Sequence, residues 1–186
     1  MGVNWAAGLI RWRPHVSADG RTHSLAHLHP FRFTCEVRIA NGSARTITIN
    51  VGFALHVFTS EFSNAAPETE EYRDDREYRT FDHERYNASL HLAALVRGIE
   101  KRKRFFAKND NFFTVEMAHA PADHEYRVFF NVRRDKTNAD SVTLIVQSAY
   151  FGRRQLSPKG ARRKQVRFRV ILLNALLGKP LREPPG

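Results

Sequence analysis

Cysteine is nearly absent from this chain of 186 residues, which contains only Cys35. A single cysteine cannot form an intrachain disulfide, and it excludes the zinc modules that need several cysteine ligands. Long apolar runs are absent too, since the run at residues 170–177 is far shorter than the roughly 20 residues of a membrane helix. The first 14 residues lack the apolar core of a signal peptide. These absences predict a cytoplasmic protein with no membrane partner.

Negative charge is also scarce, and its distribution is uneven. The chain has 30 Lys and Arg against 19 Asp and Glu, which gives a formal net charge of +11. Residues 61–100 are acidic on balance, whereas residues 101–108 and 151–186 hold most of the cationic excess. Such an excess repels itself in a compact fold unless it is exposed or meets a counter-charge. The pattern therefore predicts a polyanionic partner, with nucleic acid as the first candidate.

Several enzyme motifs are missing from the chain. It has no P-loop, no glycine-rich dinucleotide fingerprint and no paired-carboxylate signature. Ser148 lacks the flanking glycines of a hydrolase nucleophile. The corresponding enzyme classes lose most of their support, and no cofactor is predicted.

Alternation of apolar and polar residues predicts a set of strands. The expected strands span residues 31–39, 45–58, 111–118, 125–132, 141–150 and 166–172. Asn41-Gly42 is typical of a tight hairpin turn between the first two, and the next three read as an antiparallel meander. The acidic residues 60–80 contain few aliphatic side chains and are expected as a surface loop or a marginal helix.

One convincing helix is expected at about residues 88–102, with Asn87 or Ser89 as its cap. Its buried stripe consists of Leu92, Leu95, Val96 and Ile99. A short helix at 173–177 follows the last strand. The prediction is an α+β fold with a mainly antiparallel sheet of five or six strands and one principal helix packed on one face. Residues 1–29 are expected as an irregular N-terminal arm that docks through Trp5 and Trp12, residues 30–178 as a single domain, and residues 179–186 as a C-terminal tail.

Two basic segments are the strongest candidates for a nucleic-acid-binding surface. The first comprises Lys101, Arg102, Lys103, Arg104 and Lys108. The second includes Arg153, Arg154, Arg162, Arg163, Lys164, Arg167 and Arg169, the last two on one face of the expected final strand. Cations after a helix also offset its dipole, and a basic run is often a solvated surface of no specific role. Interleaved with the first segment are four phenylalanines that either belong to the core or stack on unpaired bases: Phe105, Phe106, Phe112 and Phe113.

A second set of residues suits metal-independent cleavage of RNA. In this reading His56 is the general base, Arg79 and Arg85 stabilise a transferring phosphoryl group, and Tyr150 presents a hydroxyl. The alternative for His56 is a structural histidine with a satisfied hydrogen bond. A further group could ligate zinc, but its spacing matches no established zinc motif, so no metal site is predicted. That group is His23, His27, His29 and His56 with Cys35.

Four short motifs carry a resemblance to a known family. They are His29-Pro30-Phe31, His56-Val57-Phe58-Thr59, Arg85-Tyr86-Asn87-x-Ser89 and Gln147-Ser148-Ala149-Tyr150. Together, over roughly residues 27–180, the chain resembles an uncharacterised family of bacterial proteins often found on mobile elements. The resemblance implies a bacterial, cytoplasmic and horizontally transferred protein, and it brings no catalytic residue with it.

Three hypotheses of function follow. The leading one is a nucleic-acid-binding protein, with RNA favoured over DNA, that uses a basic surface. The enzyme alternative is a metal-independent ribonuclease, which looks like the compact ribonuclease toxins in its general plan only. The third is a protein–protein interaction module in which the acidic residues 61–84 meet the basic tail of a second copy, or the basic tail meets another acidic partner. Whether the chain is an enzyme stays open at this point.

Overall fold

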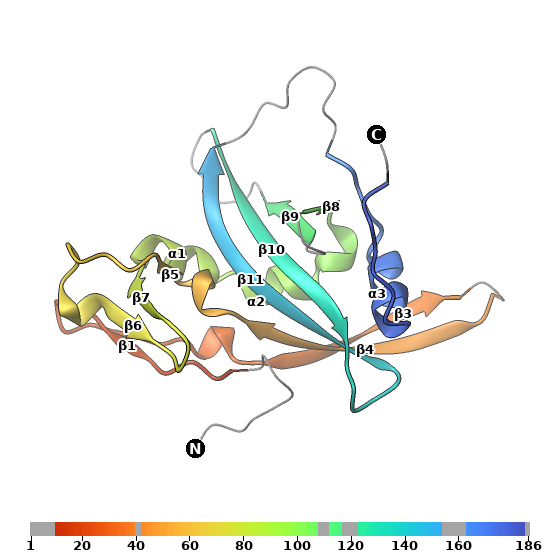
Figure 1. Ribbon diagram of the computed structural model, residues 1–186, viewed down its shortest axis with the longest axis horizontal. Helices are drawn as coiled ribbons and strands as arrows, with labels where there is room; N and C mark the ends of the chain where they lie inside the picture. The colour runs from red at the N-terminus through yellow and green to blue at the C-terminus, as the bar shows by residue number, and fades with distance from the viewer. Residues whose placement is uncertain (1–9, 40–41, 108–111, 117–122, 154–162, 185–186) are drawn as a thin grey trace.

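The computed structural model describes residues 10–39, 42–107, 112–116, 123–153 and 163–184. Its main element is a six-stranded sheet with the order β3-β4-β11-β10-β9-β8 (Figure 1). The strands are β3 (Phe31–Arg38), β4 (Ala44–Phe53), β8 (Arg104–Phe106), β9 (Phe112–Glu116), β10 (His124–Arg134) and β11 (Ser141–Arg153). All neighbours pair antiparallel except β4 and β11, which are parallel. The expected α+β fold, mostly sheet and mainly antiparallel, is confirmed at this level.

Two hairpins supply four of these strands. In the β3–β4 hairpin, Gly42 has a φ of +83°, which glycine adopts at no steric cost, and its amide donates to the Ile39 carbonyl at 2.9 Å. Asn41, its expected partner in the turn, lies outside the described residues. The β10–β11 hairpin is longer, and its register shifts at Phe129/Phe130 so that Gln147 of β11 is not paired with a residue of β10. Such a bulge increases the local twist, and Figure 1 shows the two strands as one long curved pair.

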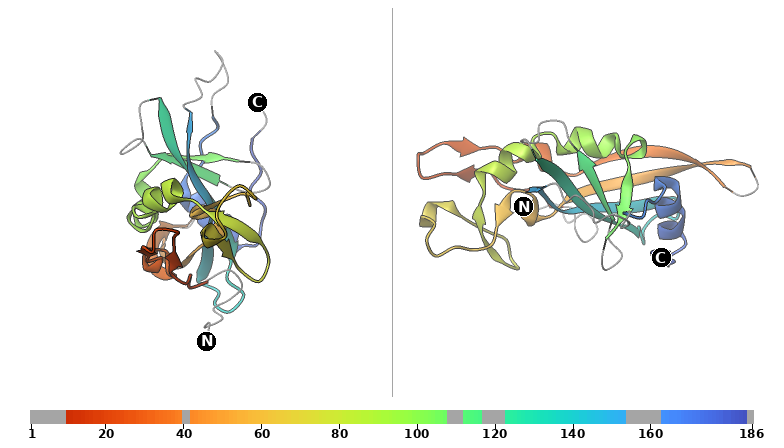
Figure 2. Two further views of the ribbon diagram at one scale, coloured as in Figure 1. Left: turned by 90° about the vertical axis from the view of Figure 1, so that its left-hand side faces the viewer. Right: turned by 90° about the horizontal axis from the view of Figure 1, so that it is seen from above.

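Two smaller sheets lie at one end of the molecule, whereas the C-terminal helix lies at the other (Figure 2). One is β1 (His15–Val16) with β2 (Thr22–His23), and the other has the order β5-β7-β6, formed by β5 (Thr59–Ser60), β6 (Glu71–Arg73) and β7 (Tyr78–Phe81). The expectation of a loop or marginal helix over residues 60–80 is therefore wrong, because β6 and β7 form a hairpin there. Backbone pairing and the buried Tyr72 and Phe81 supply the stability that the few aliphatic residues do not.

The segment before β3 packs into the main core. Trp12 is only 4% exposed, and its indole nitrogen donates to the Phe53 carbonyl at 3.0 Å. Leu25 and Leu28, the latter in the 3-10 helix η1 (Ala26–Leu28), are completely buried in the same cluster. Trp5 lies outside the described residues. The described part of the expected arm is thus continuous with the core of the domain.

The expected helix at 88–102 is divided into three short pieces. They are α1 (His83–Ser89), α2 (Leu92–Arg97) and the 3-10 helix η4 (Ile99–Lys101), so no single principal helix covers the sheet. The start is also earlier than expected, because Asp82 caps α1 by accepting from the Arg85 amide. The Ser89 hydroxyl donates to the Tyr86 carbonyl at 2.7 Å, a local bond that competes with helical continuation. The predicted buried stripe is nevertheless confirmed, since α2 and η4 bury its four residues.

The predicted strand at 166–172 is wrong, whereas the helix expected at 173–177 is present as the end of a longer helix. Residues 168–176 form one helix, α3 (Phe168–Leu176), and only Gln165 makes an isolated bridge, to Phe105 of β8. Alternation from 166 to 170 suggested a strand, but the buried residues follow the helical period. They are Phe168, Ile171, Leu172, Ala175 and Leu176.

The main sheet has one core face and one partly exposed face. Along β10, Tyr126, Val128 and Phe130 are almost completely buried, whereas Arg127 and Phe129 between them are only partly buried. We call the side of Arg127 and Phe129 the open face. In the described part of the chain, no helix is long and apolar enough to span a membrane.

Candidate nucleic-acid interface

Four aromatic rings form a continuous row across the open face. Phe105 of β8, Phe113 of β9 and Phe129 of β10 lie side by side in register, and Tyr150 of β11 continues the row. Successive ring centroids are 5.2, 5.4 and 5.7 Å apart. All four side chains are partly exposed, so each retains surface for another ring. We call these four residues the aromatic row.

The four phenylalanines of the basic segment divide between the two faces of the sheet. Phe112 is 4% exposed and Phe106 packs against the core, so both are structural. Phe105 and Phe113 belong to the aromatic row on the opposite face. The core alternative therefore applies to Phe106 and Phe112, whereas Phe105 and Phe113 keep partly exposed rings.

A cation lies against each end of the aromatic row. The Arg163 guanidinium carbon is 5.5 Å from the ring centroid of Phe113 and 5.9 Å from that of Phe105. At the other end, the Arg85 guanidinium carbon is 5.4 Å from the Tyr150 centroid. Guanidinium groups at these distances interact with aromatic faces and can also bond phosphate oxygens.

The position of Arg163 is fixed by Glu125 on the same face. The Glu125 carboxylate, only 5% exposed as a side chain, accepts from Arg163 at 2.7 Å and from Arg127 at 2.7 Å. Burial on its own raises the pKa of this carboxyl, but the two arginines outweigh burial and hold the pKa below its ordinary value. One buried carboxylate thus orients two cations and leaves this part of the face with net positive charge.

The first basic segment is only partly available for binding. Arg104 donates to the carbonyls of Ile99 and Glu100 at 3.0 and 2.8 Å and also to that of Arg102, so it holds the end of η4 in place. Arg102 is partly buried, whereas Lys101 and Lys103 are exposed. Lys108 lies outside the described residues.

The second basic segment does not form one surface as expected. Arg153 is exposed at the end of β11, and Lys164 donates to the Pro184 carbonyl. Arg167 and Arg169 are exposed, but they belong to the start of α3 and not to one face of a strand. Arg154 and Arg162 lie outside the described residues. Among the described cations of this segment, Arg163 is the one seated on the aromatic row.

The candidate catalytic residues, in contrast, are linked through Glu77 and Thr59, and Arg85 among them contacts Tyr150. His56, in the 3-10 helix η2 (Leu55–Val57), bonds through Nε2 to Oε1 of Glu77 at 2.7 Å. Arg79 donates to the Thr59 hydroxyl at 2.9 Å and contacts Glu77 at 3.5 Å. Arg85 donates to the carbonyls of His56 and Thr59 at 3.0 and 2.9 Å and lies over Tyr150. Since the His56 side chain is 42% exposed and that of Arg79 only 11%, the imidazole is the reachable group.

Comparison with family models assigns the chain to a protein family. The model of the YjaZ family matches residues 15–176, which run from the first residue of β1 to the last of α3. The chain belongs to the YjaZ family. No curated protein and no solved structure matches the chain. The expected membership of an uncharacterised family is confirmed, and its association with mobile elements stays a prediction.

The YjaZ-family chain places two further residues at the cluster that the sequence did not single out. Glu77 joins His56 to Arg79, and Thr59 joins Arg79 to Arg85. Glu77 is one of many carboxylates in the acidic residues 61–84, so nothing local distinguished it. Thr59 had a signal, because it stands in the motif that begins at His56. Tyr126 has a buried hydroxyl with no hydrogen-bond partner among the described residues, and burial raises its pKa although the charge of Arg85 opposes the rise.

The histidines of this YjaZ-family chain are distributed over separate contacts. His27 bonds to the Ser89 hydroxyl at 2.7 Å, and burial lowers the pKa of its imidazole. His23 lies near His83, with ring centroids 5.0 Å apart, whereas His56 belongs to the Glu77 cluster. Within the residues that the structure describes, no group of three or more His, Cys, Asp or Glu is arranged to hold a metal ion.

Proposed function

We propose that this YjaZ-family protein binds single-stranded nucleic acid on the open face of its sheet, with RNA favoured over DNA. The aromatic row carries the proposal, because four partly exposed rings from four strands provide stacking surfaces for successive bases. Stacking of this kind tolerates any base and contributes about 1–3 kcal/mol per base. Arg163 and Arg85 lie at the two ends of the row, where the backbone of a strand that crosses it would need positive charge.

Electrostatics supports a polyanionic ligand at this face more than contact with an acidic segment of a second copy. The carboxylates of Glu70, Asp74 and Glu77 already bond to histidine or arginine side chains of their own chain. These three carboxylates are therefore already engaged within the chain, which weakens the interaction-module alternative. The bacterial origin, cytoplasmic location and mobile-element association implied by the motifs remain predictions.

The experiment is a titration of fluorescein-labelled oligouridylate followed by anisotropy at several salt concentrations. Binding is expected to weaken steeply with salt, because each phosphate contact on a single strand contributes about 0.7 to the slope of log K against log salt. Arg163→Gln is expected to reduce this slope by about that amount. The matched control is Arg38→Gln, an exposed arginine on β3 at the other edge of the sheet. Binding that is absent, or a slope unchanged by Arg163→Gln, contradicts the proposal.

Metal-independent ribonuclease activity is the second candidate, because its residues form one linked cluster that reaches the end of the aromatic row through Arg85. His56 paired with Glu77 resembles a general base held by a carboxylate, and Arg85, which donates to the main-chain carbonyl of His56, lies over Tyr150. A labelled RNA should then be cleaved in EDTA by the wild type and left intact by His56→Ala. Glu77→Gln should lower the rate, whereas His83→Ala, at an exposed histidine bonded to Glu70, should not. Equal cleavage by His56→Ala and the wild type excludes this assignment.

A further inference from the structure

A second feature of the open face is a cavity beyond the aromatic row. Its volume is about 620 Å³, and it lies where β10 and β11 approach their connecting turn. Asn131 lines it two residues after Phe129, opposite Ile145 of β11. Because side chains two apart on a strand share a face, the cavity and the row belong to the same surface.

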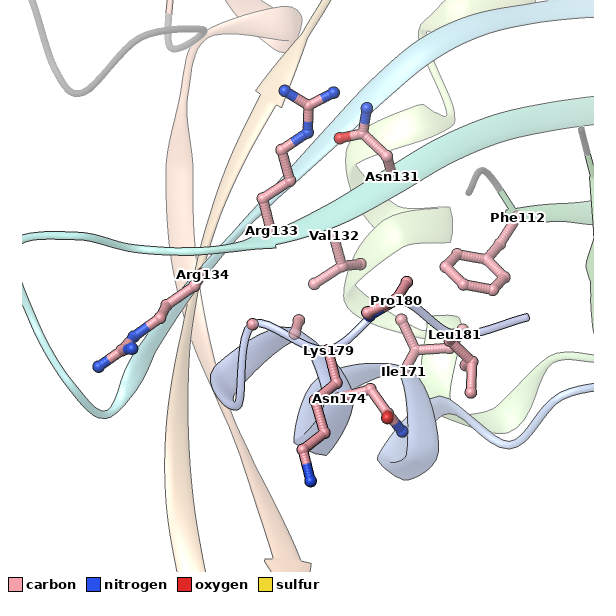
Figure 3. A pocket seen from close by; sticks show the side chains of 12 residues that line it. Phe112, Asn131, Val132, Arg133, Arg134, Ile171, Asn174, Lys179, Pro180 and Leu181 are labelled. Carbon is pink, nitrogen blue, oxygen red and sulfur yellow. The ribbon is translucent and has the colours of Figure 1, made fainter. Parts of the chain in front are cut away.

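Asn131, like Tyr126, has a buried polar atom that is left unsatisfied by the described part of the chain. It is 7% exposed, and its carboxamide oxygen has no hydrogen-bond partner within the described residues. Figure 3 shows that Asn131 and Arg133 project to the same side of β10, away from Val132, Pro180 and α3. A buried acceptor without a partner costs free energy, so it indicates a donor supplied from outside the chain.

Cations surround the same cavity. Arg133, Arg134 and Lys136 line it and are exposed, and no ion pair in the described part of the chain engages them. Arg76 reaches it from the β6–β7 turn while bonded to Asp74 at 2.6 Å. The cavity also contains Asp135, but that carboxylate is occupied by the Asn50 amide at 3.0 Å and the Thr137 hydroxyl at 2.6 Å. The cations that line the cavity outnumber its carboxylate, so the net charge around it is positive.

The remaining wall of the cavity is apolar. Ile10, Phe53 and Ile145 contribute to its lining. A cavity of several hundred Å³ with an apolar wall and a few directed polar groups is typical of a small-molecule site. The ligand that fits this combination has a flat apolar part, an N–H donor for Asn131 and at least one phosphate.

We propose that this cavity binds a 5′-phosphorylated nucleotide. The base lies against the apolar wall and donates an N–H to the carboxamide oxygen of Asn131. The phosphate is held by Arg133, Arg134 and Lys136. Each common nucleobase carries an N–H group when it is part of a nucleotide, so the contact with Asn131 requires a base but does not select one strongly.

A smaller cavity lies on the other side of β10, so an experiment can test which of the two cavities binds the nucleotide. The smaller cavity, about 440 Å³ in volume and drawn in Figure 3, shares Asn131, Arg133 and Arg134 with the first but is lined by Lys179. Lys136 belongs to the larger cavity alone and Lys179 to the smaller one alone. Lys136→Gln and Lys179→Gln are therefore matched variants, each of which removes one exposed cation from one cavity.

The experiment is calorimetric titration of the full chain with adenosine 5′-monophosphate, with adenosine and inorganic phosphate as separate probes. The monophosphate is expected to bind at least about tenfold more tightly than either part, since it alone engages the base and phosphate contacts. Lys136→Gln should weaken binding about fivefold or more, and Lys179→Gln should leave it unchanged. Leucine is similar in size to asparagine but has no acceptor, so Asn131→Leu should weaken the binding of the monophosphate and leave the binding of inorganic phosphate unchanged. Its thermal unfolding is measured alongside, and the lysine variants decide the question if Asn131→Leu does not fold.

Three outcomes overturn the proposal: no binding of the monophosphate at millimolar concentration, inorganic phosphate as tight as the monophosphate, or Lys136→Gln without effect. A mononucleotide is too short to span the aromatic row, so this result is independent of strand binding. If an oligouridylate with a 5′-phosphate competes with the monophosphate, and the same strand without the phosphate does not, the site binds strand ends. Competition by neither oligonucleotide assigns it to free nucleotides.

Discussion

Replacing Phe129 by leucine removes the ring that links the two halves of the aromatic row. Phe129 lies 5.4 Å from Phe113 and 5.7 Å from Tyr150, measured between ring centroids, so it is a central member. Leucine retains the apolar volume that packs on the sheet but has no flat surface on which a base can stack. The substitution therefore separates stacking from general hydrophobic contact.

The expected loss follows from the energy of one stacked base. Truncation of a stacking aromatic costs about 1–3 kcal/mol, which corresponds to about 5- to 150-fold in Kd. Because leucine keeps some contact with the base, we expect the lower part of this range, about 5- to 20-fold. Phe129→Tyr retains the ring and should bind within about twofold of the wild type. Folding should be little affected, since an exchange of similar apolar side chains costs less than about 1.5 kcal/mol.

The assay is anisotropy of labelled oligouridylate at one fixed salt concentration, with thermal unfolding of each variant as the test of folding. Phe62→Leu is the matched control, because Phe62 is 46% exposed and is not a member of the row. If Phe129→Leu binds as tightly as the wild type, or if Phe62→Leu loses as much, stacking on the aromatic row is not the source of affinity. If labelled DNA gives the same affinities as labelled RNA, the preference for RNA is removed, but the binding site is not.

Three further predictions concern stability and reactivity. The pKa of Glu125 is held below its ordinary value of 4.5, so the stability that Glu125 contributes is present above that pH and is lost as the pH falls through the lowered pKa. In urea denaturation, Glu125→Gln should therefore reduce the fall of the unfolding free energy at acid pH. Burial, with the nearby Glu100 carboxylate, raises the pKa of the Cys35 thiol to about 11, so iodoacetamide should react with native protein at pH 8 far more slowly than with unfolded protein. Gly42→Ala places a side chain at a φ of +83°, and it should lower the free energy of unfolding by about 1 kcal/mol, whereas the same change at Gly98, with φ of −91°, should cost less.

Local patterns in the sequence determined several elements. Alternation located β3, β4, β10 and β11, and the stripe that begins at Leu92 identified the buried side of α2 and η4. These predictions succeeded because side-chain periodicity reports burial directly over five or more residues. The same reasoning failed over residues 166–170, where a five-residue alternation was compatible with the first turns of α3. It also gave one helix where the Ser89 hydroxyl bonds back to Tyr86 and the chain divides.

The candidate site was only partly contained in the sequence. His56, Arg79, Arg85 and Tyr150 could be selected by residue type, but nothing local indicated that Glu77 would bond His56 across 21 positions. Arg167 and Arg169 were selected for a strand face that does not exist, whereas Arg163, from the same basic run, lies on two rings of the row.

Residue patterns along the chain are enough to predict an α+β fold with a mainly antiparallel sheet and a local excess of positive charge. Where that charge meets aromatic surface depends on how the strands pack together. Phe105, Phe113, Phe129 and Tyr150 share one face only because hydrogen-bond register aligns four strands. Asn131 lacks a partner among the described residues only because of what packs around it. Register between distant strands follows from turns, a bulge and the packing of the core, which no short stretch of sequence encodes.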